Sequence, residues 1–159
     1  MYKPYTVALF GHRRIDNARL VEEQLEEAVL ELLRTHGEVA FLLGRNGDFD
    51  LLAASVIRRV RRKYGYTRSP LTLVLPYMTA EYRDNEQSFL DYYDEVEIFP
   101  APLGMPAKAC FSQRNRSMVD RADQVLAFVE QERGGAYDAV EYARETGRKV
   151  TLLSKDDCI

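Results

Sequence analysis

The sequence predicts an α/β fold of three layers, in which a mostly parallel sheet of about six strands lies between helices. Two observations predict it. Short apolar runs rich in β-branched or aromatic residues recur along the chain, nearly continuous as in strands buried on both faces. Segments with helical spacing separate them, which favours right-handed crossovers and a Rossmann-like arrangement. The predicted strands are residues 5–10, 39–43, 71–75, 96–99, 125–129 and 150–153.

Helices are predicted in the intervals between these strands. In residues 16–35, apolar side chains recur every three or four positions opposite glutamates, and Gly37 is placed as a left-handed stop. Residues 48–64 show the same spacing, with Asp48 placed to cap the helix. The remaining helical segments are predicted at 80–93, within 107–122 and at 137–146, and the proline-rich segment 99–110 is the longest predicted loop.

Composition and charge narrow the class of protein. The chain has 159 residues, 46% hydrophobic and 30% charged, which fits one domain over residues 1–159. It contains no apolar run of the roughly 18 residues that a spanning helix needs, and its N-terminal segment lacks the features of a signal peptide. We therefore expect a cytoplasmic protein without a membrane partner. The net charge of −3 provides no global field for nucleic acid, which is not expected as a partner.

Glycine and arginine follow several of the predicted strands. In an open parallel sheet, ligands bind outside the carboxyl ends of the strands, and the N-terminus of a helix offers unpaired N–H groups to an anion. Any one of these loops is explained by turn chemistry alone, whereas three on the same edge favour a binding site. The candidate ligand-binding residues in these loops are Gly11, His12, Arg13, Gly44, Arg45, Asn46, Gly47, Asp48, Gly134 and Gly135.

Two basic segments have structural explanations as well as functional ones. Residues 58–68 carry most of their arginines near a helix C-terminus, where the helix dipole favours cations, and a nucleic-acid patch is the alternative. Residues 111–123 taken alone are typical of a solvated charged helix, with Arg116 and Asp120 one turn apart.

No metal or cofactor is expected from the histidines and cysteines. His12 and His36 have no cysteine or carboxylate at metal spacing. Cys110 and Cys158 are far apart in the sequence and are expected to be reduced thiols.

Two late motifs resemble the SLOG superfamily, which groups the Smf/DprA proteins with the LONELY GUY phosphoribohydrolases. They are "FSQRNRSMVDRADQVLAFV" and "RGGAYDAVEYARETGRKV", in which Arg114-Asn115-Arg116, Asp123, Gly134-Gly135 and Gly147-Arg148 follow the DprA-like pattern. The stretches "FGHR" and "LLGRNGDFDLLAA" look like the shorter YpsA-type branch. In order and spacing, the resemblance covers most of the chain.

The resemblance implies roles for particular residues. In the LONELY GUY enzymes a helix Arg and a Glu after a double-glycine motif act on the N-glycosidic bond of a nucleoside 5′-monophosphate. Arg114 and Glu141 fall at these positions, with Asn115 beside Arg114 as a further ligand contact. This chain departs from that motif at Arg133, Tyr137, Asp138 and Asn115.

The departure at Asp138 bears directly on phosphate binding. A carboxylate there would compete for the same N–H groups and repel a dianion. We therefore expect the ligand's phosphate to lie closer to Arg13, Arg45 or the helix start at Asp48, or the ligand to carry less charge near Asp138.

These features predict a module that binds a nucleotide or nucleotide sugar, without a cofactor. The alternative is a phosphoribohydrolase in which Arg114 orients the substrate and Glu141 steadies the ribose hydroxyls or the developing positive charge. A weaker alternative is DNA binding in the manner of DprA, through residues 58–63 and 114–116. A homo-oligomer is implied by the resemblance only.

Overall fold

The computed structural model describes residues 3–153 and contains one six-stranded sheet in the order β4-β3-β2-β1-β5-β6. Every strand pair is parallel, which confirms the predicted fold class. The strands are β1 (Tyr5–Gly11), β2 (Val39–Leu43), β3 (Leu71–Leu75), β4 (Glu95–Ile98), β5 (Gln124–Phe128) and β6 (Lys149–Leu152). The helices are α1 (Ala18–His36), α2 (Asp48–Tyr64), α3 (Ala80–Asp84), α4 (Glu86–Tyr92), α5 (Ala107–Asp120) and α6 (Gly135–Glu145).

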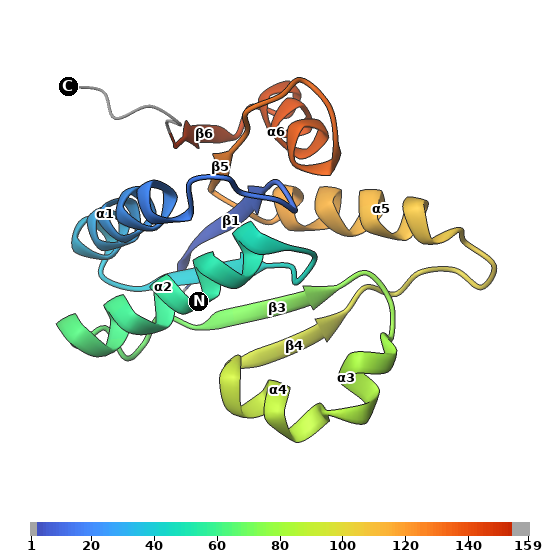
Figure 1. Ribbon diagram of the computed structural model, residues 1–159, viewed down its shortest axis with the longest axis horizontal. Helices are drawn as coiled ribbons and strands as arrows, with labels where there is room; N and C mark the ends of the chain where they lie inside the picture. Colours follow the sequence, from blue (N-terminus) through green and yellow to red (C-terminus); the bar gives the residue numbers. More distant parts are fainter. Residues whose placement is uncertain (1–2, 154–159) are drawn as a thin grey trace.

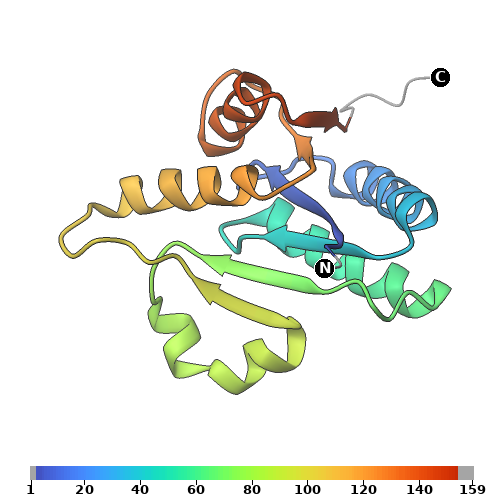
Figure 2. The same cartoon turned by 180° about the vertical axis from the view of Figure 1, so that it is seen from behind.

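Helices cover both faces of the sheet and divide the core into two layers. Alternate residues of a strand point to opposite faces, so Leu9 joins the cluster under α1 and α2, while Phe10 joins the cluster under α5 and α6. The first cluster also receives Tyr82 and Phe89 from α3 and α4. Figures 1 and 2 show α6 beside β6 at one edge of the sheet, and α3 and α4 beside β4 at the other.

Several predicted helix boundaries need correction. The helix predicted at 80–93 is two helices, because Asn85 leaves the helical conformation at φ −135° and ψ 33°. Gly47, and not Asp48, holds the cap position of α2, and Asp48 is the first helical residue. The proline-rich loop is shorter than predicted because α5 begins at Ala107. Cys158 lies outside the described residues, while Cys110 is a buried free thiol.

The order of the strands places a crevice beside β1. The chain adds β2, β3 and β4 on one side of β1 and then returns to add β5 and β6 on the other. The connections after β1 and β5 therefore diverge toward opposite faces, which leaves an opening at the carboxyl ends of these strands. None of the helices in residues 3–153 is long and apolar enough to cross a membrane.

Candidate ligand-binding site at the carboxyl edge of the sheet

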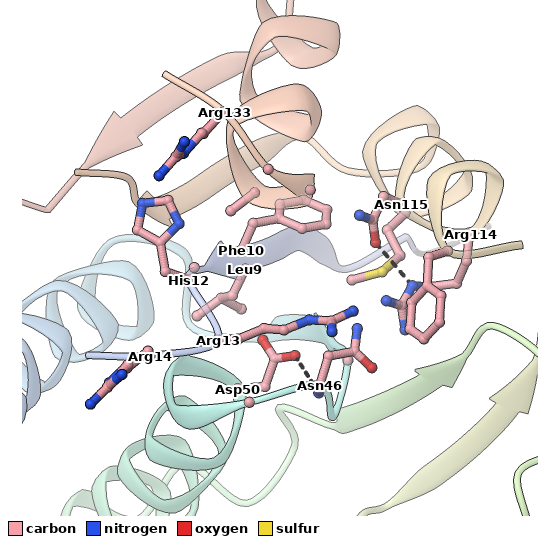
Figure 3. A pocket seen from close by; sticks show the side chains of 18 of the residues that line it. Leu9, Phe10, His12, Arg13, Arg14, Asn46, Asp50, Arg114, Asn115 and Arg133 are labelled. Atoms are coloured by element: carbon pink, nitrogen blue, oxygen red, sulfur yellow. Dashed lines mark hydrogen bonds between the residues drawn. The ribbon is translucent and has the colours of Figure 1, made fainter. Parts of the chain in front are cut away.

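A cavity of about 520 Å³ opens at the carboxyl ends of β1, β2 and β5, where the strand order reverses (Figure 3). It is walled by the loops after these strands and by one side of α5. The predicted ligand-binding residues that line it are Gly11, His12, Arg13, Gly44, Asn46, Gly47, Arg114, Asn115, Gly134 and Gly135. The fold therefore brings the candidate loops together, as their positions after parallel strands predict.

Arg45 and Asp48 are not among the residues that line this cavity. The Nε of Arg45 donates to Glu81 at 2.6 Å, and its Nη1 donates to the Tyr93 hydroxyl at 3.2 Å. The carboxylate of Asp48 accepts from the backbone N–H of Ile15 at 3.1 Å. Both side chains are thus engaged in holding neighbouring elements in place.

At the start of α2, backbone N–H groups that could bind a phosphate already donate hydrogen bonds within the protein. The N–H of Asp48 donates to the Arg13 carbonyl at 2.8 Å, and the N–H of Phe49 donates to the His12 carbonyl at 3.4 Å. The N–H of Asn46 donates to the Asp50 carboxylate at 2.9 Å. These bonds tie the loop after β1 to α2 and argue against α2 as the phosphate-binding helix.

Two of the candidate glycines are required by close packing. A Cβ on Gly11 would lie 2.0 Å from the Phe49 ring, and a Cβ on Gly47 would lie 2.4 Å from the Cα of Arg13. The loops after β1 and β2 can approach each other this closely only without side chains. At these two positions, packing is a sufficient explanation for glycine.

The start of α6 differs from the start of α2. Gly134 occupies the cap position at φ 96°, and no side chain caps the helix. Gly134, Gly135 and Ala136 all line the cavity, so the first turn of α6 faces it. A helix start in this position presents backbone N–H groups and the positive end of the helix dipole to a bound anion. Asp138 lines the adjoining groove instead.

Arg114 is buried, contrary to the interpretation of residues 111–123 as a solvated helix. Its side chain is 2% exposed, its Nη1 donates to the Val74 carbonyl at 2.7 Å, and its Nε donates to the Asn115 side chain at 2.9 Å. It lies four residues from both Cys110 and Met118, so it shares the helix stripe that packs on the sheet. That spacing could have predicted the burial.

Asp50 is a site residue that the sequence analysis missed. It lies in the first turn of α2, it is 9% exposed, and its side chain lines the cavity (Figure 3). Burial raises the pKa of the Asp50 carboxyl to about 6, although the Asn46 N–H and the charges of Arg114 and Arg13 oppose this shift. Asp50 shares the buried face of α2 with Ala54 and Ile57, a spacing from which its burial could have been expected.

Asp50 and Arg114 face each other across Gly44. A Cβ on Gly44 would lie 3.1 Å from the Asp50 Oδ2 and 3.0 Å from the Arg114 Nη1. Burial lowers the pKa of Arg114 to about 10, with Asp50 opposing that change, so both groups are charged at neutral pH. Arg13 enters the same space from the loop after β1 (Figure 3).

Replacing Asp50 with Asn is expected to stabilise the protein at neutral pH. The folded pKa of about 6 exceeds the ordinary 3.8, so ionised Asp50 disfavours the folded state, and its contribution to stability falls as pH rises from about 4 through about 6. The difference between variant and wild type should approach about 3 kcal/mol at pH 7.5 and vanish below pH 4. Urea unfolding of both proteins across this pH range measures it.

Other titrating groups, including His12, are present in both proteins, so the difference isolates Asp50. Burial lowers the pKa of His12 more than the nearby Glu130 raises it, so the ring is neutral near pH 7. A variant that is less stable than wild type at pH 7.5 would contradict the buried charge.

His12 is oriented by a backbone hydrogen bond. Its Nε2 accepts from the N–H of Glu130 at 2.8 Å, so the neutral ring carries its proton on Nδ1. The ring also packs edge-on against Phe128 at the end of β5. His12 therefore ties the loops after β1 and β5 together at the wall of the cavity. No group of three or more His, Cys, Asp or Glu side chains suited to a metal ion occurs within residues 3–153.

A second cavity, of about 730 Å³, adjoins the first between α5 and α6. The two share Arg13, Phe111, Asn115, Gly134 and Gly135 as lining residues. Glu141 lines only the second cavity, which we term the α5–α6 groove, and its carboxylate pairs with Arg144 at 2.9 Å. Arg114 lines only the first. The two residues implied as catalytic therefore face different but connected spaces.

The fold and the cavity define a Rossmann-like α/β protein with a candidate ligand site at the point where the strand order reverses. No protein-family model matches the chain. It is 25% identical over 165 residues to a UPF0398 protein of Bacillus pumilus (strain SAFR-032). The alignment covers 98% of this chain and 86% of that protein.

Two solved structures share the fold over 97% of this chain. DNA processing protein A (DprA) of Streptococcus pneumoniae superimposes with a TM-score of 0.72 at 18% identity, and this chain spans 52% of its length. DNA processing protein A of Helicobacter pylori superimposes with a TM-score of 0.70 at 16% identity, and this chain spans 67% of its length. Both structures share the fold that the resemblance to the SLOG superfamily implies.

Proposed function

We propose that this protein is a binding module for a nucleotide or nucleotide sugar, whose phosphate lies at the start of α6. One observation carries the proposal: the uncapped first turn of α6, Arg13 and Arg133 all face the same cavity. Backbone N–H groups at a helix start and guanidinium groups are the usual ligands of phosphate.

The size and charge of the cavity support such a ligand. A volume of about 520 Å³ lies within the range of small-molecule sites. Arg13, Arg14, Arg114 and Arg133 outnumber Asp50, the only carboxylate among the lining residues that the structure describes. A bound anion would balance this excess of positive charge.

Replacing Arg133 with Gln is expected to weaken nucleotide binding about tenfold or more, because one charge-assisted hydrogen bond to phosphate is lost. Arg133 is exposed and its Nε donates to the side-chain oxygen of Gln131 at 3.3 Å, so the fold should be unaffected. Isothermal titration calorimetry with a panel of nucleoside 5′-monophosphates measures the change in affinity.

Arg19→Gln is the matched control, since this arginine on α1 is 90% exposed and is not among the residues that line the cavity. It removes the same charge and should leave the affinity unchanged. Failure of every nucleotide to bind the wild-type protein would overturn the proposed function.

A phosphoribohydrolase is the second candidate, because the cavity and the α5–α6 groove are connected. A ligand extending from Gly134-Gly135 into the groove would come near Glu141, the position implied as catalytic. The same nucleotide incubations, analysed chromatographically for free base, test this function. Release by wild type that is absent in Glu141→Gln would establish the enzyme, and no release by either protein would leave the binding module.

DNA binding is the third candidate, and the structural neighbours weaken our expectation that nucleic acid is not a partner. The Helicobacter pylori structure describes a single-stranded DNA binding mode of that protein. In the basic segment of this chain, Arg61 pairs with Asp94 and Arg59 contacts Glu22 and Glu26, which offsets part of the charge. A mobility shift of single-stranded DNA that weakens steeply with salt would support this candidate.

We also propose four further properties that the sequence suggests. The chain forms a single SLOG-type domain over residues 1–159, belongs to the YpsA-type branch, is located in the cytoplasm and self-associates. Light scattering coupled to size-exclusion chromatography tests the last of these.

A further inference from the structure

The hydrogen-bond acceptors in the cavity are unequally available. Several lining side chains already use theirs on protein donors. The Asn115 oxygen accepts from Arg114 at 2.9 Å, and the Gln131 oxygen accepts from Arg133 at 3.3 Å. The Nε2 of His12 accepts from a backbone N–H. These acceptors are therefore partly occupied before a ligand binds.

Asp50 is the buried acceptor with unused capacity. It is 9% exposed, and its Oδ2 accepts from the N–H of Asn46 at 2.9 Å. A carboxylate has about four acceptor positions, so further donors can be accommodated. Among the described residues, Asp50 forms no ion pair within 4.0 Å, and the Arg114 guanidinium donates to Val74 and Asn115 instead. The carboxylate is thus held in a cavity with its hydrogen-bonding capacity only partly used.

The position of Asp50 suits the sugar of a nucleotide. It follows β2, on the opposite side of β1 from the start of α6, and both line the same cavity. A phosphate at α6 would direct the attached ribose across the end of β1. A ribose offers two adjacent O–H donors, which match the two oxygens of one carboxylate.

We propose that Asp50 accepts hydrogen bonds from the ribose hydroxyls of the bound ligand, so that the site selects ribonucleotides over 2′-deoxyribonucleotides. This inference rests on the proposed nucleotide-binding function and adds the class of sugar. It assigns the hydroxyl-binding role to Asp50, whereas the resemblance implies Glu141, which lines the α5–α6 groove and pairs with Arg144.

The test is isothermal titration of wild type and Asp50→Asn with matched ribonucleoside and 2′-deoxyribonucleoside 5′-monophosphates at pH 7.5. The wild type should bind the ribonucleotide about 10- to 100-fold more tightly, the range for a hydrogen bond to a charged group. Asp50→Asn should reduce this preference to less than about threefold, mainly by lowering the affinity for the ribonucleotide. Asp84→Asn removes a carboxylate from exposed α3 and should keep the full preference.

The outcomes separate this inference from the function on which it rests. Equal binding of both sugars by wild type, or a preference unchanged in Asp50→Asn, would overturn the role of Asp50 while leaving nucleotide binding established. A preference for the deoxyribonucleotide would also overturn it and would direct attention to DNA. No binding of either nucleotide by wild type would reject both proposals. Thermal unfolding of each variant confirms that a lost preference is not a lost fold.

Discussion

Replacing Arg114 with Ala is expected to lower the free energy of unfolding by about 3–5 kcal/mol, because it removes a large buried side chain and leaves buried polar groups without a partner. The substitution leaves the Val74 carbonyl without its donor at the buried end of β3. It also removes one of the two positive charges that oppose the burial of ionised Asp50. Urea unfolding at pH 7.5 measures the loss.

Two companion variants make this prediction specific. Arg121→Ala removes the same charge at the end of α5, where the pair with Glu97 is exposed, and should cost at most about 1 kcal/mol. Arg114→Lys keeps the charge without the planar pair of donors and should fall between. A loss below 1 kcal/mol for Arg114→Ala would contradict the structural role.

The pH dependence of the Arg114→Ala variant adds a further check. Below pH 6 Asp50 becomes protonated and no longer needs a compensating charge. The destabilisation should therefore be smaller at pH 5 than at pH 7.5. Because Arg114 supports the fold, a change in ligand binding by the Arg114→Ala variant could reflect lower stability as well as a lost contact. Arg133 is therefore the better residue for testing ligand contact.

Replacing Gly11 with Ala is expected to destabilise the protein by about 3 kcal/mol, at the upper end of overpacking effects. The added Cβ would lie 2.0 Å from Cγ of Phe49, whose side chain is fully buried and cannot move into solvent. The loop after β1 would have to separate from α2. Chemical unfolding of the purified variant tests this, and loss of soluble expression would agree with it.

Two variants distinguish this clash from a general intolerance of glycine replacement. A Cβ on Gly135 would meet its nearest neighbour, Asn115, at 3.7 Å, so Gly135→Ala should change stability by less than about 1 kcal/mol. Combining Gly11→Ala with Phe49→Ala should cost less than the sum of the two single changes, because alanine lacks the Cγ and Cδ atoms that the new Cβ would meet. Additive costs would contradict the proposed contact.

Most of the fold followed from local patterns. Apolar runs located every strand to within a residue or so, and they are continuous in the four central strands, which are buried along most of their length and admit few polar residues. The edge strands β4 and β6 are partly exposed and contain charged residues. The helix boundaries were less accurate where local hydrogen bonding decides them. Asn85, for example, interrupts the helical segment and donates its side-chain N–H to the carbonyl of Glu81 at 2.9 Å.

The sequence by itself determined the layered α/β class and the edge of the sheet at which the candidate loops gather, since both depend on periodicity and strand direction. Only the tertiary structure decided which side chains face the cavity. Arg45 and Arg114 look alike in the sequence, yet Arg45 turns toward Glu81 and Arg114 is buried beside Val74. The same packing buries the Asp50 carboxylate and leaves part of its hydrogen-bonding capacity unused. Burial and orientation depend on elements distant in the chain, which local spacing does not specify.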